Sequence, residues 1–272
     1  MNKGLLGISN NISSNLDKIL LWSKSFQSVC DGKVILIAGD ATDEELETLK
    51  KNNILPFPVR IKNKNEVNNE RIEHTLEFLK NTGTELFMIT DVFDVVFQND
   101  PFEKFNLQKY DIFISSEGLK LNEEPWNADV IKKSFPEKQN NVRLDDIVCS
   151  GVIGGKTKQL ISLFKNMQEL LSNSLNGHNI KDQAALIILK NENKIPNLKV
   201  FNLNDSWAVH CAVAGPSYEF LNWNLGSILE KRYNIPYIDN GVIYTKDGRV
   251  YDIIHQFNRI DDWHNQIVKK YA

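Results

Sequence analysis

The sequence has only three cysteines, and their spacing matches no metal-binding or redox motif. Cys30, Cys149 and Cys211 form no C-x-x-C pair, which argues against a disulfide framework and a zinc site and favours a reducing compartment. No run approaches the roughly 18 apolar residues of a membrane helix, and the first residues do not resemble a signal peptide. We therefore expect a cytoplasmic protein without a transmembrane segment, and we leave a peripheral contact with a membrane open.

Positive charge is not in excess either. The formal net charge is -3 and the isoelectric point is about 6.0. Nucleic-acid-binding domains carry a basic surface, so we expect no nucleic-acid partner. The glycine-rich loops that hold phosphates in P-loop and dinucleotide-binding proteins are also absent from the sequence. A bound phosphate must therefore be held by other groups.

The composition is that of a folded protein, because 42% of the 272 residues are hydrophobic and 25% are charged. This length is sufficient for a substantial core. The sequence contains no internal repeat, low-complexity segment or linker. We expect one domain over residues 1–272, with a nucleotide-binding half at 1–100 and an acceptor half at 101–272.

Apolar runs alternate with amphipathic helical patterns in the first part of the chain, which predicts a mostly parallel sheet covered by helices on both faces. The expected fold class is α/β and Rossmann-like, with a smaller antiparallel element. In the first part, strands are expected at residues 4–9, 33–39, 57–61 and 85–91, and helices at 13–29, 41–52 and 69–81. In the second part, strands are expected at 111–116 and 149–155, helices at 157–174 and 180–192, a loop with a short helix at 117–143, and a hairpin at 242–254.

Two carboxylates stand at the end of an expected buried strand, in the segment TDVFDVVF. Ligands of open parallel sheets bind at the carboxyl ends of the strands. Asp91 and Asp94 repel each other there unless a cation lies between them. The spacing predicts a divalent metal that bridges two phosphates. On spacing alone, an exposed Asp91 and an Asp94 that caps the next turn stay open.

The segment TDVFDVVF resembles the acidic metal motif of GT-A glycosyltransferases, in the D-x-x-D variant of the glycosyltransferase domains of lysyl hydroxylases. Three later segments resemble the same group, in the same order. CSGVIGG at 149–155 is similar to its N-S-G-x-x-G segment, with Cys149 in the place of the common Asn. KDQAAL at 181–186 is similar to a D-Q segment shared with the glycogenin-like transferases. DIIHQFNR at 252–259 is similar to the strand whose histidine completes the metal site.

The resemblance implies a metal-dependent glycosyltransferase that moves a sugar from a nucleoside diphosphate donor, UDP-linked in the resembling families, to a hydroxyl of a glycan or another acceptor. It also implies retention of the anomeric configuration. Two alternatives stay open. A sugar nucleotidyltransferase needs a glycine-rich basic loop, which the early segment GISNNISS lacks. A catalytically silent nucleotide-sugar-binding protein is the other.

The resemblance also assigns the site residues, some of which have a simpler alternative. Asp91, Asp94 and His255 are the expected ligands of Mn2+ or Mg2+, although a lone histidine can equally be a buried structural residue. Asp182 and Gln183 are the catalytic candidates, although Asp182 can equally cap a helix. The donor candidates are Ile8, Ser9, Asn10, Arg71, Val92 and Phe93.

Three donor and acceptor assignments leave an alternative open. Phe93 can stack on a base or pack in the core, and Arg71 can reach a phosphate or face water. The sugar and acceptor candidates are Ser150, Gly151, Trp126 and Arg259. Gly151 can let a ligand approach the backbone or can serve a tight turn. The variable acceptor loops are expected at Gly118–Arg143 and Ala212–Tyr237.

Overall fold

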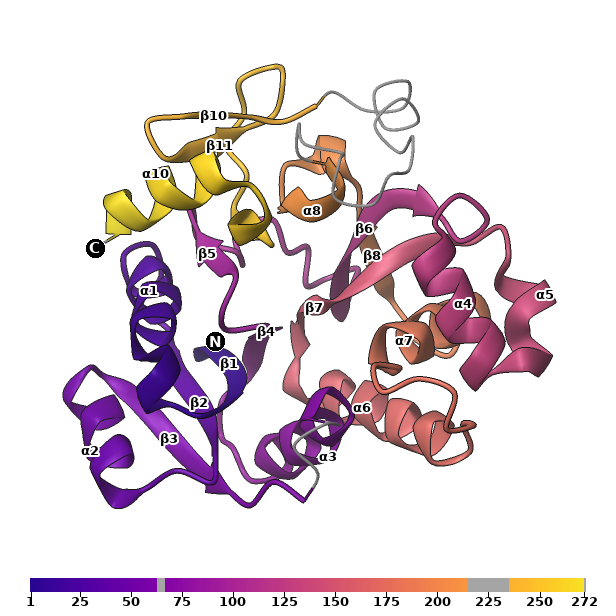
Figure 1. Ribbon diagram of the computed structural model, residues 1–272, viewed down its shortest axis with the longest axis horizontal. Coiled ribbons are helices and arrows are strands. Elements are labelled where there is room, and N and C mark those ends of the chain that lie inside the picture. The colour runs from indigo at the N-terminus through magenta and orange to yellow at the C-terminus, as the bar shows by residue number, and fades with distance from the viewer. Residues whose placement is uncertain (63–66, 215–234, 272) are drawn as a thin grey trace.

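The computed structural model describes residues 1–62, 67–214 and 235–271. Its central sheet has seven strands in the order β3-β2-β1-β4-β7-β6-β8 (Figure 1). β7 is antiparallel to β4 and to β6, and the other neighbouring pairs are parallel, which confirms the predicted mostly parallel α/β sheet. The strands are β1 (Lys3–Asn10), β2 (Lys33–Gly39), β3 (Ile54–Val59), β4 (Leu86–Thr90), β6 (Ile112–Lys120), β7 (Asp146–Lys156) and β8 (Leu198–Phe201).

Helices cover both faces of this sheet, as the continuous apolar strands predict. Successive residues of β1 point to opposite faces, so Leu5 joins a core with Trp22 of α1, and Leu6 joins a core with Leu76 of α3. α3 and α6 lie side by side (Figure 1). The helices around the sheet are α1 (Leu16–Gln27), α2 (Asp43–Lys51), α3 (Val67–Lys80), α6 (Thr157–Ser172) and α7 (Asp182–Asn191).

The segment at 117–143 contains more regular structure than expected. β6 continues to Lys120, and two helices follow, α4 (Pro125–Ser134) and α5 (Gln139–Val142). The Glu124 carboxylate accepts hydrogen bonds from the backbone N–H groups of Trp126 and Asn127, both at 2.8 Å. An acidic cap followed by proline at the first helical position starts a helix. The short helix expected in this segment is therefore present, but the rest of the segment is less of a loop than predicted.

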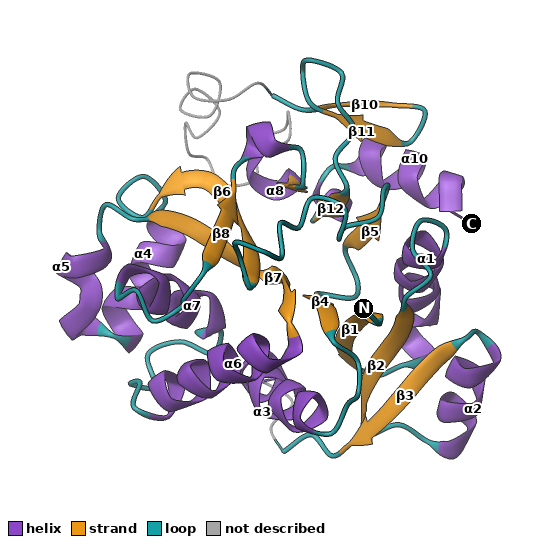
Figure 2. Cartoon of the chain, turned by 180° about the vertical axis from the view of Figure 1, so that it is seen from behind, coloured by secondary structure: helices purple, strands orange, loops and turns teal. Residues whose placement is uncertain are grey.

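A second sheet of three strands includes β12, from the C-terminal part of the chain. β12 (Ile253–His255) lies between β5 (Val95–Phe97), to which it is antiparallel, and β9 (Ala208–His210), to which it is parallel. Figure 2 shows β12 and β5 next to each other, above β4 in that view. The described residues also form four short 3-10 helices and two further α-helices: η1 (Ser13–Asn15), η2 (Pro136–Lys138), η3 (Leu203–Asp205), η5 (Phe257–Arg259), α8 (Cys211–Ala214) and α10 (Asp261–Tyr271).

The predicted hairpin at 242–254 is only partly correct. Its turn forms, because the Thr245 N–H donates to the Arg249 carbonyl at 2.8 Å and Gly248 adopts a φ of +82°. However, β11 (Val242–Tyr244) pairs with β10 (Tyr237–Asp239), and a single bridge joins Tyr244 to Val250. β12 is buried along its whole length, and a strand between two neighbours satisfies its backbone better than one arm of a hairpin.

The edge strand β3 also differs, since it covers residues 54–59 rather than 57–61. Prolines at 56 and 58 are tolerated there because one side of an edge strand needs no hydrogen bonds. Among the residues that the structure describes, no helix is long and apolar enough to cross a membrane.

Candidate active site

Backbone hydrogen bonds bring the acidic segment to the C-terminal histidine. β5 and β12 pair so that Val95 lies opposite His255, and the Gln256 N–H donates to the Asp94 carbonyl at 2.8 Å. The Asp91 N–H donates to the Gly151 carbonyl at 3.0 Å, at the end of the β4–β7 ladder. The three predicted metal ligands therefore come from the ends of paired strands.

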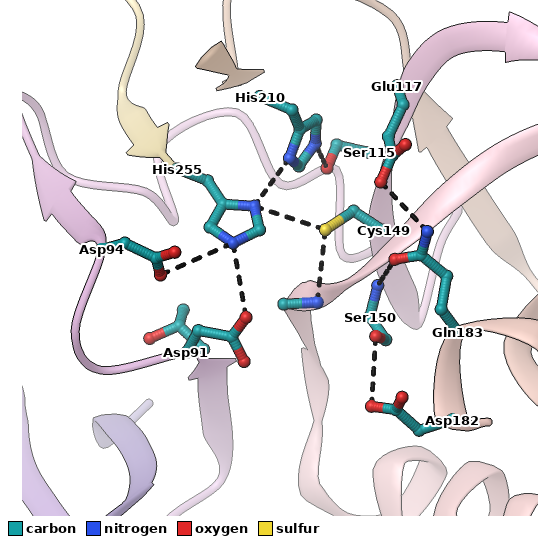
Figure 3. Close-up of polar contacts among 12 residues, drawn as sticks. Asp91, Asp94, Ser115, Glu117, Cys149, Ser150, Asp182, Gln183, His210 and His255 are labelled. Carbon is teal, nitrogen blue, oxygen red and sulfur yellow. Dashed lines mark hydrogen bonds and ion pairs between the residues drawn. The ribbon is translucent and has the colours of Figure 1, made fainter. Parts of the chain in front are cut away.

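These ligands converge, as Figure 3 shows. His255 Nε2 lies 3.3 Å from Asp91 Oδ2 and 3.7 Å from Asp94 Oδ1. The three ligand atoms lie within 4.8 Å of one another. The Nε2 atom is buried and has no hydrogen-bond partner among the described residues. Two carboxylate oxygens and one imidazole nitrogen suit Mn2+ or Mg2+, so the residues fit such an ion.

The charges at this cluster are strongly coupled. Burial alone would raise the pKa of Asp91, but Arg71 and His255 hold it well below its usual range. Burial and the charge of Asp91 raise the pKa of Asp94. Burial alone would lower the pKa of His255, but Cys149, Asp94 and Asp91 raise it well above the usual value. Without a metal, a proton on His255 thus supplies the positive charge between the carboxylates.

Arg71 connects the acidic cluster to the catalytic candidate Asp182. Its guanidinium forms ion pairs with Asp91 and with Asp182, and it donates to the carbonyl and to the hydroxyl of Ser150 at 3.1 and 3.0 Å. Burial alone would lower the pKa of Arg71, but the two carboxylates raise it. The side chain is only 13% exposed, so the alternative in which Arg71 faces water is wrong.

Asp182 begins α7 but does not cap it. The N-cap of α7 is Lys181, and no side-chain cap bond is present. The carboxylate of Asp182 instead binds Arg71 and accepts from the Ser150 hydroxyl at 3.2 Å. Asp182 is 1% exposed and is held by these two partners. The alternative role as an ordinary helix cap is therefore wrong.

Gln183 is held in one orientation by three partners. Its carbonyl oxygen accepts from the Ser150 N–H at 3.3 Å, and its amide group donates to Glu117 at 3.1 Å and to Asn127 at 3.0 Å. Glu117 and Asn127 were not among the predicted site residues. Both lie in the segment predicted as a loop with a short helix, where their burial could not be read from the pattern.

A cavity of about 420 Å³ lies over these groups. It is lined by ten predicted site residues: Arg71, Asp91, Asp94, Trp126, Ser150, Gly151, Asp182, Gln183, His255 and Arg259. Trp126 is 40% exposed, at the start of α4. The structure therefore brings together every predicted metal, catalytic and acceptor residue. The segment at 212–237, expected as an acceptor loop, lies largely outside the described residues.

Five predicted donor residues do not line this cavity. Ile8, Ser9 and Asn10 form the end of β1, where the Ser9 hydroxyl donates to the Asn10 carbonyl at 3.0 Å. Val92 is buried, and the Phe93 ring lies 5.6 Å from Lys18 Nζ. The donor role of these five residues stays a prediction.

Gly151 lies where the metal cluster leaves no room for a side chain. It is part of β7, not of a tight turn, and a Cβ there would lie 2.7 Å from Asp91 Oδ2 and 2.8 Å from His255 Cε1. We expect Gly151→Ala to displace both ligands and weaken Mn2+ binding by about tenfold or more, as disturbed ligand positioning does. Isothermal titration of Mn2+ measures this. Gly83→Ala is the matched control, because no atom lies within 4 Å of its Cβ position; equal affinities in the two variants would contradict the assignment.

We expect Glu117 to make the stability of the protein dependent on pH. Burial, and then the nearby Glu124, raise the pKa of Glu117 from 4.5 to about 7. Between these two values the folded protein holds a proton that the unfolded chain has released, so stability falls as pH rises. We expect Glu117→Gln to gain about 2–3 kcal/mol in unfolding free energy relative to the wild type between pH 5 and pH 8. Urea denaturation at both pH values tests this, and a constant difference would contradict it.

The mostly parallel α/β sheet flanked by helices is a GT-A-type fold. The family model of nucleotide-diphospho-sugar transferases matches residues 52–251, and the chain belongs to that family. It is therefore a glycosyltransferase. No curated protein sequence matches the chain significantly.

Solved structures of glycosyltransferases share the fold. The galactosyltransferase LgtC, in complex with donor and acceptor sugar analogues, is 13% identical with a TM-score of 0.57, over 98% of this chain and 94% of that chain. An active-site mutant of LgtC is 10% identical with a TM-score of 0.55, over 98% of this chain and 95% of that one. The bifunctional glycosyltransferase WbbM, in its apo form, is 10% identical with a TM-score of 0.58, over 100% of this chain and 50% of that one. At these identities the likeness concerns the fold alone.

Proposed function

We propose that this glycosyltransferase uses a divalent cation, Mn2+ or Mg2+, held by Asp91, Asp94 and His255, and a UDP-linked sugar as donor. The observation that carries the metal proposal is the His255 Nε2 atom. It is buried, has no hydrogen-bond partner among the described residues and is directed at two carboxylates at the carboxyl end of a sheet strand. The UDP-linked donor follows from the resemblance of the acidic motif.

When bound, such a cation offsets the negative charge that develops on the leaving diphosphate. The residues around it hold the ligands in place. Arg71 binds the Oδ1 atom of Asp91 and leaves Oδ2 directed at His255. The guanidinium of Arg71 also binds Asp182, so this one side chain holds both the metal ligand Asp91 and the catalytic candidate Asp182 in place.

The remaining roles divide between the two halves of the chain. The end of β1, with Ile8, Ser9 and Asn10, and the segment of Val92 and Phe93 are assigned to the nucleotide. The cavity residues Ser150, Gly151, Trp126 and Arg259 are assigned to the transferred sugar and the acceptor. The aromatic face of Trp126 suits the CH groups of a sugar.

In the reaction, the bond from the anomeric carbon to the diphosphate breaks and the acceptor hydroxyl oxygen forms a bond to that carbon on the same face, while the hydroxyl proton passes to the departing diphosphate oxygen. Asp182 and Gln183 line the cavity where these atoms meet. We propose that the anomeric configuration is retained, as in the families that the motifs resemble. Gln183 enters the reaction with its amide already fixed by Glu117 and Asn127.

A thermal-shift screen of UDP, UDP-glucose and UDP-galactose, each with and without Mn2+, tests the donor and the metal together. Stabilisation by a UDP-sugar only in the presence of Mn2+ is the expected result. Release of UDP from the same donor separates an enzyme from a silent binding protein. Stabilisation by nucleoside triphosphates but not by UDP-sugars would instead favour the nucleotidyltransferase.

A further inference from the structure

A buried hydrogen-bonded chain lies behind the metal cluster, on the side of His255 that faces away from the carboxylates. His255 Nδ1 lies 2.8 Å from His210 Nδ1 and 3.4 Å from Cys149 Sγ. His210 Nε2 lies 2.7 Å from Ser115 Oγ (Figure 3). The four residues are between 0% and 2% exposed, so these contacts are shielded from bulk solvent.

Strand pairing fixes the positions of the residues in this hydrogen-bonded chain. β9 and β12 are parallel neighbours with His210 in register with His255. Ser115 belongs to β6 and Cys149 to β7, and these two strands are paired in the central sheet. Each member thus comes from a strand, which holds the two rings in place more firmly than a loop would.

The distances determine where the protons lie. A histidine that binds a metal through Nε2 must carry its ring proton on Nδ1. That proton points at His210 Nδ1, and two nitrogens at 2.8 Å share a single proton, so His210 Nδ1 must accept it. The proton of the neutral His210 ring then lies on Nε2, from which it is donated to Ser115 Oγ. The protons on His255 Nδ1 and His210 Nε2 keep these positions when His255 carries protons on both nitrogens.

We propose that His210 is a positioning residue that fixes the tautomer of His255, by accepting its Nδ1–H and leaving Nε2 free to bind the cation. This inference rests on the proposed metal site. Metal-binding histidines generally donate their second ring N–H to a carboxylate, a carbonyl or water. Here the acceptor is an imidazole, with the Cys149 sulfur as a second and weaker acceptor.

The same atoms also form a group of one thiol and two imidazoles that could hold a soft metal. The distance between the two Nδ1 atoms favours a shared proton over a bound metal ion. Two nitrogens bound to a tetrahedral zinc ion at about 2.0–2.1 Å lie roughly 3.3 Å apart, whereas His210 Nδ1 and His255 Nδ1 are 2.8 Å apart. This is a hydrogen-bond distance.

Two variants of His210 separate its acceptor role from its bulk. The Asn side chain in His210→Asn can place an oxygen near the position of Nδ1, whereas the Leu side chain in His210→Leu accepts nothing. We expect His210→Leu to weaken Mn2+ binding by about 10–100-fold and His210→Asn to stay within about threefold of the wild type. Calorimetric titration of Mn2+ measures both. An unchanged affinity in His210→Leu, or equal losses in the two variants, would overturn the proposal.

Nitrogen-15 NMR of the wild-type rings gives a readout that needs no variant and no activity. We expect His210 to be protonated on Nε2 and not on Nδ1, in the metal-free protein and with Mg2+. A protonated His210 Nδ1 would overturn the proposal. Zn2+ binding that depends on Cys149 and His210 but not on Asp94 would do so as well. If the wild type and Asp94→Asn bind Mn2+ equally, the proposed metal site fails, and the tautomer of His210 is still read from the metal-free protein.

Discussion

Asp94→Asn is expected to abolish the Mn2+-dependent binding of UDP while the protein stays folded. Asn keeps the shape of the side chain and removes the charge that a hard cation requires. In the structure Asp94 Oδ1 lies 3.7 Å from His255 Nε2, and burial raises the pKa of Asp94. The ion pair between Asp91 and Arg71 stays intact in this variant. A cation on a diphosphate is worth several kcal/mol, so UDP affinity with Mn2+ should fall about 100-fold or more.

Calorimetric titration of UDP, with and without Mn2+, measures this loss. Asp31→Asn is the matched control, because Asp31 is exposed just before β2, at the opposite edge of the sheet from the carboxyl end that carries Asp91, and makes the same change of charge. Asp91→Asn is a less selective test, since it also breaks the ion pair with Arg71 and should lower thermal stability as well. Undiminished Mn2+-dependent binding in Asp94→Asn would remove the acidic motif from the site.

Asp182→Asn is expected to lower the turnover number by about 100-fold, the usual effect of removing one preorganised charged group from an active site. The affinity for UDP with Mn2+ should stay within a few fold. Asp182 contacts Arg71 and Ser150 in the cavity but none of the three metal ligands directly. Asn can still accept from the Ser150 hydroxyl, but it leaves the charge of Arg71 opposed by Asp91 alone.

Steady-state kinetics with the donor, once known, measures the two effects separately. Asp129→Asn is the control, because Asp129 forms a half-exposed ion pair with Lys133 on the surface of α4. If Asp182→Asn lowered thermal stability and turnover in parallel, and more active enzyme were recovered at low temperature, Asp182 would have a structural role instead.

The sequence was sufficient to predict the central sheet and most of its helices. Continuous apolar strands such as β2 and β4 have a strong local signal, and burial on both faces follows from it. The local signal failed where long-range pairing decides the structure. β12 does not pair with its expected hairpin partner, because a position between β5 and β9 buries it fully.

The residues of the candidate site likewise fall into those that the sequence can predict and those that it cannot. Asp91 and Asp94 can be found from their spacing, and His255 from its resemblance to a family motif, although more than a hundred residues of sequence separate it from them. His210, Glu117 and Asn127 carry no local signal. They reach the site only because strands and helices from distant segments pack together. The two halves of the domain and the cytoplasmic location stay predictions.

A crystal structure with UDP and Mn2+, with the ion located by its anomalous scattering, tests the central claim most directly. The account predicts one ion in contact with Asp91, Asp94 and the Nε2 atom of His255, and with the diphosphate. An ion bound elsewhere, or a His255 Nε2 atom more than about 2.5 Å from it, would contradict the account.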